Sequence, residues 1–141
     1  MLTGDKGETA LEIGLRCGLY DRNTMTIFNV VESTDLNELI SSLTSHVASI
    51  EAEELGSNGL EPCKFAMAVA GKSLPTIYGS AESSALIKQL FKKCEAVIVY
   101  RSSPAQKAET VKYIRKHLGT SWHTPLTTMA IGDGANDVNM I

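Results

Sequence analysis

Short apolar runs alternate with longer amphipathic segments along the chain, and this alternation restricts the fold more than any other feature. Residues 96–100 are continuously apolar, as expected of a strand that is buried on both faces of a parallel sheet. Comparable β-rich runs occur at residues 25–31, 64–70 and 126–131. Strands that alternate with helices predict an α/β domain with a mainly parallel sheet flanked by helices.

Helical periodicity fills most of the intervening segments, at residues 5–18, 35–54, 80–93 and 104–117. Asp5 and Asp35 suit the N-cap positions of the first two helices, and Gly18 suits the end of the first. Residues 75–77 are expected to return as a short strand beside the 64–70 run. We also expect residues 136–141 to begin a helix.

The composition is that of an ordinary soluble globular protein. Thirteen basic residues against sixteen acidic ones give a net charge of −3, so the chain lacks the basic excess typical of nucleic-acid-binding proteins. Its longest apolar runs are far shorter than the roughly 20 residues that cross a bilayer. Cys17, Cys63 and Cys94 form neither a CxxC pair nor a zinc-binding spacing, so we expect reduced thiols.

A segment rich in glycine and aspartate, Gly132 to Asp137, directly follows the last apolar run. In open α/β sheets, ligands bind at the carboxyl ends of strands, and glycines beside Asp133 allow a sharp turn that exposes its carboxylate. Asp133, Asp137 and the amide of Asn136 are suitable ligands for Mg²⁺, which takes one or two carboxylates plus phosphate oxygens. The competing interpretation is an ordinary turn between a strand and a helix.

Two further clusters carry groups suited to phosphate, one near the start of the chain and one after the 96–100 run. Thr3-Gly4-Asp5-Lys6 places a hydroxyl group where it can donate to a phosphoryl oxygen, but the segment also suits a simple helix cap and turn. Lys107 lies in the first turn of a helix that begins at Pro104. Its ammonium can neutralise a transferring phosphoryl group, whereas a lone lysine on a helix is most often a solvated surface residue.

Taken in their order along the chain, the three clusters resemble the phosphorylation domain of P-type ATPases, within the haloacid dehalogenase superfamily. The matching segments are residues 2–10 (LTGDKGETA), 101–107 (RSSPAQK) and 132–141 (GDGANDVNMI). Asn139-Met140-Ile141 stands where ion-pumping branches usually have Pro-Ala-Leu, so the last segment is most similar to the type IV, phospholipid-flippase branch. The resemblance implies a Rossmann-like, haloacid dehalogenase-like sheet that is incomplete in this chain.

The resemblance also implies roles for individual residues. Thr3 would hold a phosphoryl oxygen and Lys107 would steady its negative charge, which suits a reaction that relies on positioning and charge neutralisation. Mg²⁺ and ATP are the implied cofactor and substrate. The implied catalytic residues are Thr3, Lys107, Asn136 and Asp137, the metal ligands Asp133 and Asp137, and the nucleotide-binding residues Gly4, Asp5 and Arg101.

One hallmark of the family does not occur in these residues. The chain has no Asp-Lys-Thr-Gly-Thr segment, which in the family provides the phosphorylated aspartate on a central strand. We therefore expect residues 1–141 to be the C-terminal part of a phosphorylation domain, inactive in isolation, with 21–62 a less specific, branch-dependent segment. The intact protein would be a multi-pass membrane ATPase that moves a phospholipid, with this segment on the cytosolic face. Its nucleotide-binding, actuator and transmembrane parts, and a companion subunit, would lie outside this chain.

Two alternatives remain compatible with these residues. The chain could come from a free-standing phosphatase of the same superfamily, which also uses a lysine and a Gly-Asp-Gly-x-Asn-Asp segment. It could instead be a pump-like module that serves regulation or interaction without catalysis. The full-length sequence distinguishes them, because a nucleophilic aspartate and membrane spans favour the pump.

Overall fold

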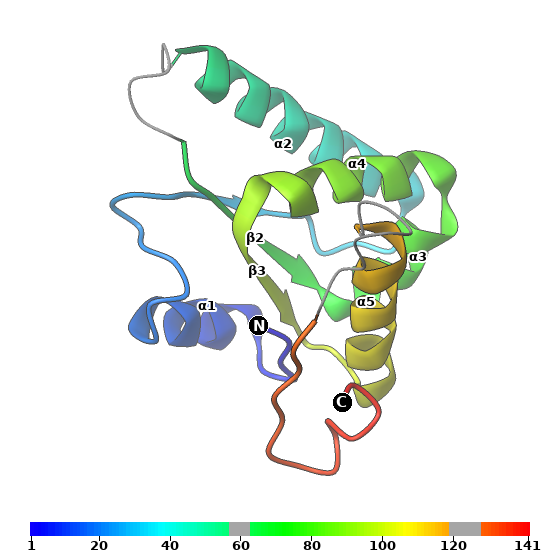
Figure 1. Cartoon of the computed structure of the whole chain (residues 1–141). Helices are drawn as coiled ribbons and strands as arrows, with labels where there is room; N and C mark the ends of the chain where they lie inside the picture. The colour runs from blue at the N-terminus through cyan, green and yellow to red at the C-terminus, as the bar shows by residue number, and fades with distance from the viewer. Residues whose placement is uncertain (57–62, 119–127) are drawn as a thin grey trace, which may run out of the picture.

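Helices and strands alternate along the chain in the computed structural model, which describes residues 1–56, 63–118 and 128–141 (Figure 1). The strands that it describes form a parallel sheet in the order β1-β2-β3, so the predicted α/β class with a parallel sheet is confirmed. The elements are α1 (Gly7–Arg16), β1 (Thr26–Asn29), α2 (Leu36–Gly56), β2 (Phe65–Ala70), η1 (Gly71–Ser73), α3 (Leu74–Gly79), α4 (Ala81–Lys93), β3 (Cys94–Tyr100) and α5 (Pro104–His117).

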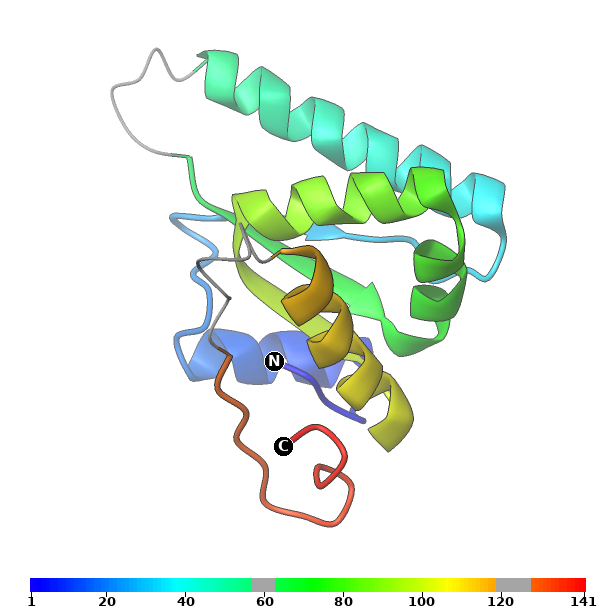
Figure 2. The same ribbon diagram turned by 45° about the vertical axis from the view of Figure 1, so that its right-hand side comes forward.

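Helices cover both faces of this sheet. The long helix α2 packs beside α4 on one face, and α1 covers the other (Figures 1 and 2). Successive side chains of a strand point to opposite faces, so β2 contributes to two cores. Phe65 and Met67 pack on the α2 and α4 side, whereas Ala66 and Ala68 pack on the α1 side. Every residue of β2 is buried, as expected of the central strand.

The first residues of the chain extend the sheet beyond β3. Leu2 forms a parallel bridge with Val99. The Val99 N–H donates to the carbonyl of Met1 at 2.8 Å, and the Thr3 N–H donates to the carbonyl of Val99 at 2.9 Å. Because all these segments run parallel, Thr3 lies at the same carboxyl edge as the ends of β1, β2 and β3.

Three predicted elements are wrong. Residues 75–77 lie within α3 rather than in a strand, because Leu74 and Ile77 are buried on one side of a helical turn. Residues 128–131 of the expected last strand have no strand structure, and 126–127 lie outside the described residues. In the part of the chain that is described, no strand pairs with this segment, and an isolated strand is not stable. Residues 136–141 form turns instead of a helix.

The helix ends agree better with the predictions. The side chain of Asp35 accepts from the Glu38 N–H at 3.0 Å, as expected of an N-cap. Gly18 follows α1 with a φ of 71°, which is the left-handed conformation that glycine adopts after a helix. The prediction for Asp5 is wrong, because Lys6 occupies the N-cap position of α1 and makes no side-chain cap.

Candidate functional site

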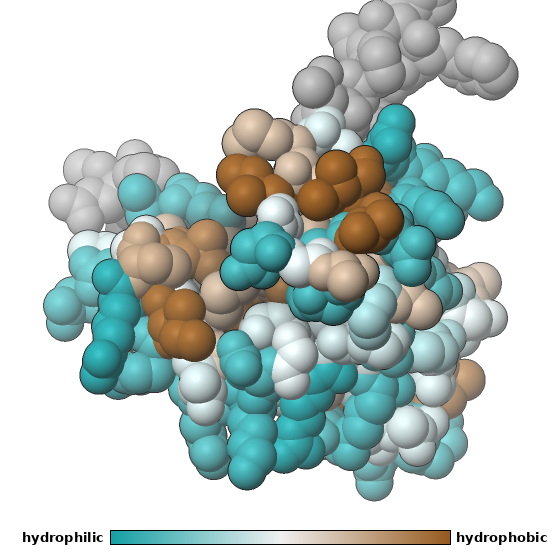
Figure 3. All heavy atoms as spheres, turned by 90° about the horizontal axis from the view of Figure 1, so that it is seen from below, coloured by the Kyte–Doolittle hydropathy of each residue, from teal (hydrophilic) through white to brown (hydrophobic). Residues whose placement is uncertain are grey.

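An open groove of about 940 Å³ lies at the carboxyl edge of the sheet. Residues 1–5 form one side, residues 129–137 form the other, and α5 contributes Lys107. Figure 3 views the molecule from the side on which the C-terminal segment lies, where polar and apolar side chains are intermixed. The groove brings together most of the predicted site residues, namely Thr3, Gly4, Asp5, Lys107, Asp133, Asn136 and Asp137. Arg101 is the exception, although its backbone N–H donates to the carbonyl of Asp5 at 2.9 Å.

Thr3 and Asp5 close a tight turn at the end of the first segment. The Thr3 hydroxyl donates to Asp5 Oδ2 at 2.7 Å and accepts from the Asp5 N–H at 3.1 Å. The carbonyl of Thr3 accepts from both the N–H and the hydroxyl of Ser102, at 3.0 and 2.9 Å. This turn is therefore fixed to the loop after β3, with the Thr3 hydroxyl at the groove.

Lys107 and Asp137 form a buried ion pair in the groove. Lys107 Nζ lies 2.8 Å from Asp137 Oδ1, and the two side chains are only 7% and 8% exposed. The interpretation of Lys107 as a solvated surface lysine is therefore wrong. A pair removed from water in this way needs close geometry to offset the lost hydration, and the short contact provides it.

The start of α5 determines where Lys107 points. Ser103 is the N-cap, and its side chain accepts from the Gln106 N–H while the Gln106 side chain accepts from the Ser103 N–H. This reciprocal capping box, together with Pro104 in the first turn, fixes the start of the helix. Lys107 follows one turn later, with its N–H bonded to the carbonyl of Ser103 at 3.0 Å.

Close approach of the buried Asp137 side chain explains Gly132 in the Gly132 to Asp137 segment. A Cβ atom on Gly132 would overlap Cβ of Asp137, whereas one on Gly134 would overlap only Oδ1 of the exposed Asn136, which can rotate away. The Asp137 N–H donates to the carbonyl of Gly134 at 3.0 Å, which folds the segment back on itself. Asp133 remains exposed at the groove, as its flanking glycines predict.

The donor set in the groove fits Mg²⁺ by its chemistry. Asp133, Asn136 and Asp137 provide hard oxygen atoms, and Asp137 uses Oδ1 for Lys107 while Oδ2 has no ion-pair partner among the described residues. In that part of the chain, no cluster of three or more His, Cys, Asp or Glu side chains could hold a metal by itself. Two carboxylates suffice for Mg²⁺, which completes its shell with water and phosphate oxygens.

Two charged residues near the site were missed by the sequence predictions. Glu32 Oε1 lies 3.1 Å from Lys72 Nζ and 3.3 Å from Arg101 Nη1. Burial and the Glu32 carboxylate raise the pKa of Tyr100, while Arg101 lowers it. Lys72 could have been found, because it is the second residue after the 64–70 run, as Arg101 is the first after 96–100. Nothing in the sequence pattern indicates Glu32.

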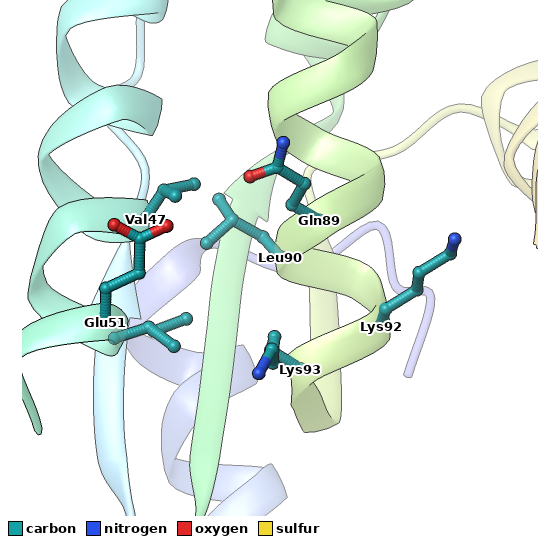
Figure 4. Close-up of a pocket in the computed structure, with 7 residues that line it drawn as sticks. Val47, Glu51, Gln89, Leu90, Lys92 and Lys93 are labelled. Carbon is teal, nitrogen blue, oxygen red and sulfur yellow. The ribbon is translucent and has the colours of Figure 1, made fainter. Parts of the chain in front are cut away.

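A second cavity, of about 260 Å³, lies between α2 and α4 (Figure 4). Val47, Ile50 and Leu90 provide apolar walls, and Glu51 and Lys93 stand at its rim. It is near the end of α4 that leads into β3, so it opens at the amino edge of the sheet, away from the groove. Among the described residues that line it, there is no hydroxyl group and no carboxylate pair, and we assign it no chemistry.

The cysteines are free, as predicted. Cys63 and Cys94 are half-buried, whereas Cys17 is exposed. Burial raises the pKa of Cys94 to about 12, so this thiol stays protonated and unreactive at neutral pH.

The chain is similar to known proteins over its whole length. The sequence profile of the haloacid dehalogenase-like hydrolases matches residues 19–141. The phospholipid-transporting ATPase tat-1 of Caenorhabditis elegans is 41% identical over 145 residues, covering 100% of this chain and 11% of that protein. The phospholipid-transporting ATPase IH of Homo sapiens is 34% identical over 154 residues, covering 100% of this chain and 13% of that protein. The phospholipid-transporting ATPase DNF2 of Saccharomyces cerevisiae is 32% identical over 158 residues, covering 100% of this chain and 9% of that protein.

This chain thus spans about a tenth of the length of these relatives. None of the helices in residues 1–56, 63–118 and 128–141 combines the length and hydrophobicity that a membrane crossing requires.

Proposed function

The chain belongs to the haloacid dehalogenase-like hydrolases, and we propose that it is the C-terminal part of the phosphorylation domain of an ATP-driven, phospholipid-translocating P-type ATPase. The observation that supports this most is the buried Lys107–Asp137 pair, which shares one groove with Thr3 and Asp133. A cation, a hydroxyl group and two carboxylates at one sheet edge suit phosphoryl transfer, which relies on positioning and charge neutralisation.

Each groove residue has a role in this proposal. The Thr3 hydroxyl donates to an oxygen of the phosphoryl group, exchanging its present acceptor on Asp5 for a new one. Lys107, held by Asp137, neutralises the negative charge of that group. Asp133 and Asp137 hold Mg²⁺, and Asn136 orients the groups around it. When bound, the ion supplies further positive charge beside the phosphoryl oxygens.

The remaining predicted residues are Gly4 and Asp5, which line the groove, and Arg101, which does not, and we place all three on the nucleotide side. We assign Gly4, Asp5 and Arg101 to contacts with ATP, because Arg101 is bonded through its backbone to the Thr3–Asp5 turn. The phosphorylated aspartate comes from another part of the intact protein, on a strand that pairs with the free edge of residues 1–3. The exposed side chains of Met129 and Ile131, 85% and 79% accessible, support an apolar neighbour there.

The rest of the pump also lies outside these residues. In this proposal, the intact protein is a multi-pass membrane ATPase with nucleotide-binding, actuator and transmembrane parts, and with a companion subunit. This segment then lies on the cytosolic face, where ATP is available. Hydrolysis of ATP drives a phospholipid between the two leaflets.

The metal site provides the direct test. We expect Asp133→Asn to weaken Mg²⁺ binding by about tenfold or more, because it removes the exposed carboxylate of the groove. Calorimetry measures the affinity, and amide NMR locates the binding through shifts at residues 132–137.

Asp21→Asn is the matched control. It makes the same chemical change in an exposed turn before β1, and the amide side chain can still accept from the Asn23 N–H. We expect this variant to bind Mg²⁺ as the wild type does. Equal affinities in Asp133→Asn and the wild type would refute the metal role of Asp133.

A further inference from the structure

A shared carboxylate links the ends of all three strands at the carboxyl edge of the sheet. Glu32 follows β1, Lys72 follows β2 and Arg101 follows β3. Glu32 Oε1 lies 3.1 Å from Lys72 Nζ and 3.3 Å from Arg101 Nη1. Glu32 is the least exposed of the three: 30% of its side chain is accessible, compared with 53% for Lys72 and 51% for Arg101. Because the two cations repel each other, this carboxylate is what allows them to lie close together.

The backbone on both sides of the cluster is held in place. Arg101 has a φ of 50°, in the left-handed region that residues other than glycine rarely occupy, and its N–H is bonded to the carbonyl of Asp5 at 2.9 Å. On the other side, Glu32 is followed by Ser33, whose carbonyl accepts from the buried Ser73 hydroxyl at 2.7 Å. The ion pairs therefore join fixed segments rather than two flexible side chains on loose loops.

Glu32 leaves most of the binding capacity of Arg101 unused. An arginine side chain has five N–H donors in a planar fork, and Glu32 contacts Nη1 alone. In the described part of the chain, no other side chain accepts a hydrogen bond from Arg101. Half-exposed ion pairs of this kind contribute little to stability, so a role in positioning accounts for the arrangement better than a role in folding.

We propose that Glu32 is a positioning residue that holds Arg101 and Lys72 together, so that both cations contact the polyphosphate of a nucleotide. This inference rests on the proposed function, in which Arg101 lies on the nucleotide side, and it adds Lys72 and Glu32 to that side. The Arg101 N–H donates to the carbonyl of Asp5, which lines the groove, so the backbone of the cluster adjoins the groove.

The test is an NMR titration of the 141-residue chain with millimolar ATP and Mg²⁺. The Nε–H signal of Arg101 reports on the cluster, and the amide signals of Thr3, Asp5 and Asp133 report on the groove. We expect Glu32→Gln and Lys72→Met each to raise the dissociation constant for ATP about threefold or more, because the contacts are no longer preorganised. Without ATP, Glu32→Gln should also increase the picosecond to nanosecond mobility of the Arg101 guanidinium.

Lys64→Met is the matched control, because it removes the same charge at the opposite end of β2, where Lys64 pairs with Glu95. We expect it to leave the ATP affinity unchanged. Denaturation midpoints close to that of the wild type in all variants would show that the affinity change is not a folding defect.

The outcomes separate this inference from the proposed function. An unchanged ATP affinity in Glu32→Gln would overturn the inference. A higher ATP affinity would also overturn it, because it would mean that Glu32 competes with the ligand for the two cations. Unchanged affinity in Lys72→Met would overturn the contact by Lys72. In both cases, ATP-dependent shifts at Thr3 and Asp133 would leave the proposed function intact. If the wild type shows no ATP-dependent shifts at Thr3, Asp5 or Asp133, the inference is overturned. The proposed function places the nucleotide-binding part outside this chain, so it is judged separately, by the Mg²⁺ affinity of Asp133→Asn.

Discussion

Lys107 shows how strongly the surroundings of a residue decide its chemistry. Lysines are seldom buried, yet this side chain is only 7% exposed, and its partner Asp137 is 8% exposed. Removing two charges from water costs free energy, which their attraction at 2.8 Å largely offsets. The pair therefore places a positive charge at a defined point of the groove, which a solvated lysine would not do.

Removing one member of this pair should destabilise the chain. Lys107→Met leaves the Asp137 carboxylate buried without a partner, and we expect the free energy of unfolding to fall by about 3 kcal/mol. Urea denaturation followed by circular dichroism measures the change. Lys112→Met, on an exposed position of the same helix, is the control and should change the stability by less than about 0.5 kcal/mol. A loss below about 1 kcal/mol in Lys107→Met would contradict this, and would mean that the 128–141 segment detaches at little cost and returns the Asp137 carboxylate to water.

At the scale of elements, the two faces of the sheet are packed with side chains of different size. Large side chains fill the space under α2 and α4, whereas small ones lie between α1 and the sheet. On α1, Ala10 packs in one cluster with Ala66, Ala68 and Ala96 of the strands. Gly14 is also buried, and its nearest neighbours are Ile98 and Tyr20. This helix therefore approaches the sheet closely, which brings its N-terminus and the adjoining Thr3–Asp5 turn to the carboxyl edge.

Gly14 is the tightest point of that contact. A Cβ atom there would lie 2.9 Å from both Ile98 Cδ1 and Tyr20 Cε1. We expect Gly14→Val to lower the free energy of unfolding by about 1–3 kcal/mol, because α1 must move away from the sheet. Gly56→Val, at the end of α2, is the control, because no atom of the described residues lies within 4 Å of the added Cβ. Equal denaturation midpoints for the two variants would contradict close packing at Gly14.

At the scale of the whole molecule, the sheet has a free edge beside the candidate site. Residues 1–3 pair with β3 on one side, and among the described residues no strand pairs with their other side. The segment that lines the far side of the groove exposes Met129 and Ile131, and beyond the turn it exposes Val138 and Ile141. Apolar surface of this extent at an open sheet edge is typical of a place where another polypeptide packs.

The chain by itself should not hydrolyse phosphate esters. The site has the groups that neutralise charge but no nucleophilic aspartate in an Asp-Lys-Thr-Gly-Thr segment, so no covalent intermediate can form. We expect release of p-nitrophenol from p-nitrophenyl phosphate to equal the blank, with and without Mg²⁺. Turnover that survives repurification and disappears in Lys107→Met would contradict this expectation.

Many features of the fold were predictable because they depend on neighbours in sequence. The continuous apolar run at 96–100 became β3, and Asp35 caps α2 as its position before the apolar stripe predicted. Predictions failed where the local pattern was ambiguous or a distant partner was needed. The run at 75–77 is too short to distinguish a strand from a helical turn. Residues 128–131 of the expected last strand have no partner strand among the described residues, and a strand needs one.

The chemical groups of the candidate site could be recognised from residue types and from their positions after predicted strands. The contacts between different clusters could not be predicted, because they join residues far apart in the chain. Lys107 and Asp137 are 30 residues apart, and Glu32 and Arg101 are 69 apart. The Glu32–Arg101 pair depends on the order of the parallel strands, which places the ends of β1 and β3 in one sheet, and the Lys107–Asp137 pair depends on the C-terminal segment folding against the start of α5. Local sequence thus determines the groups at each strand end, while the folded sheet determines which of these groups become partners.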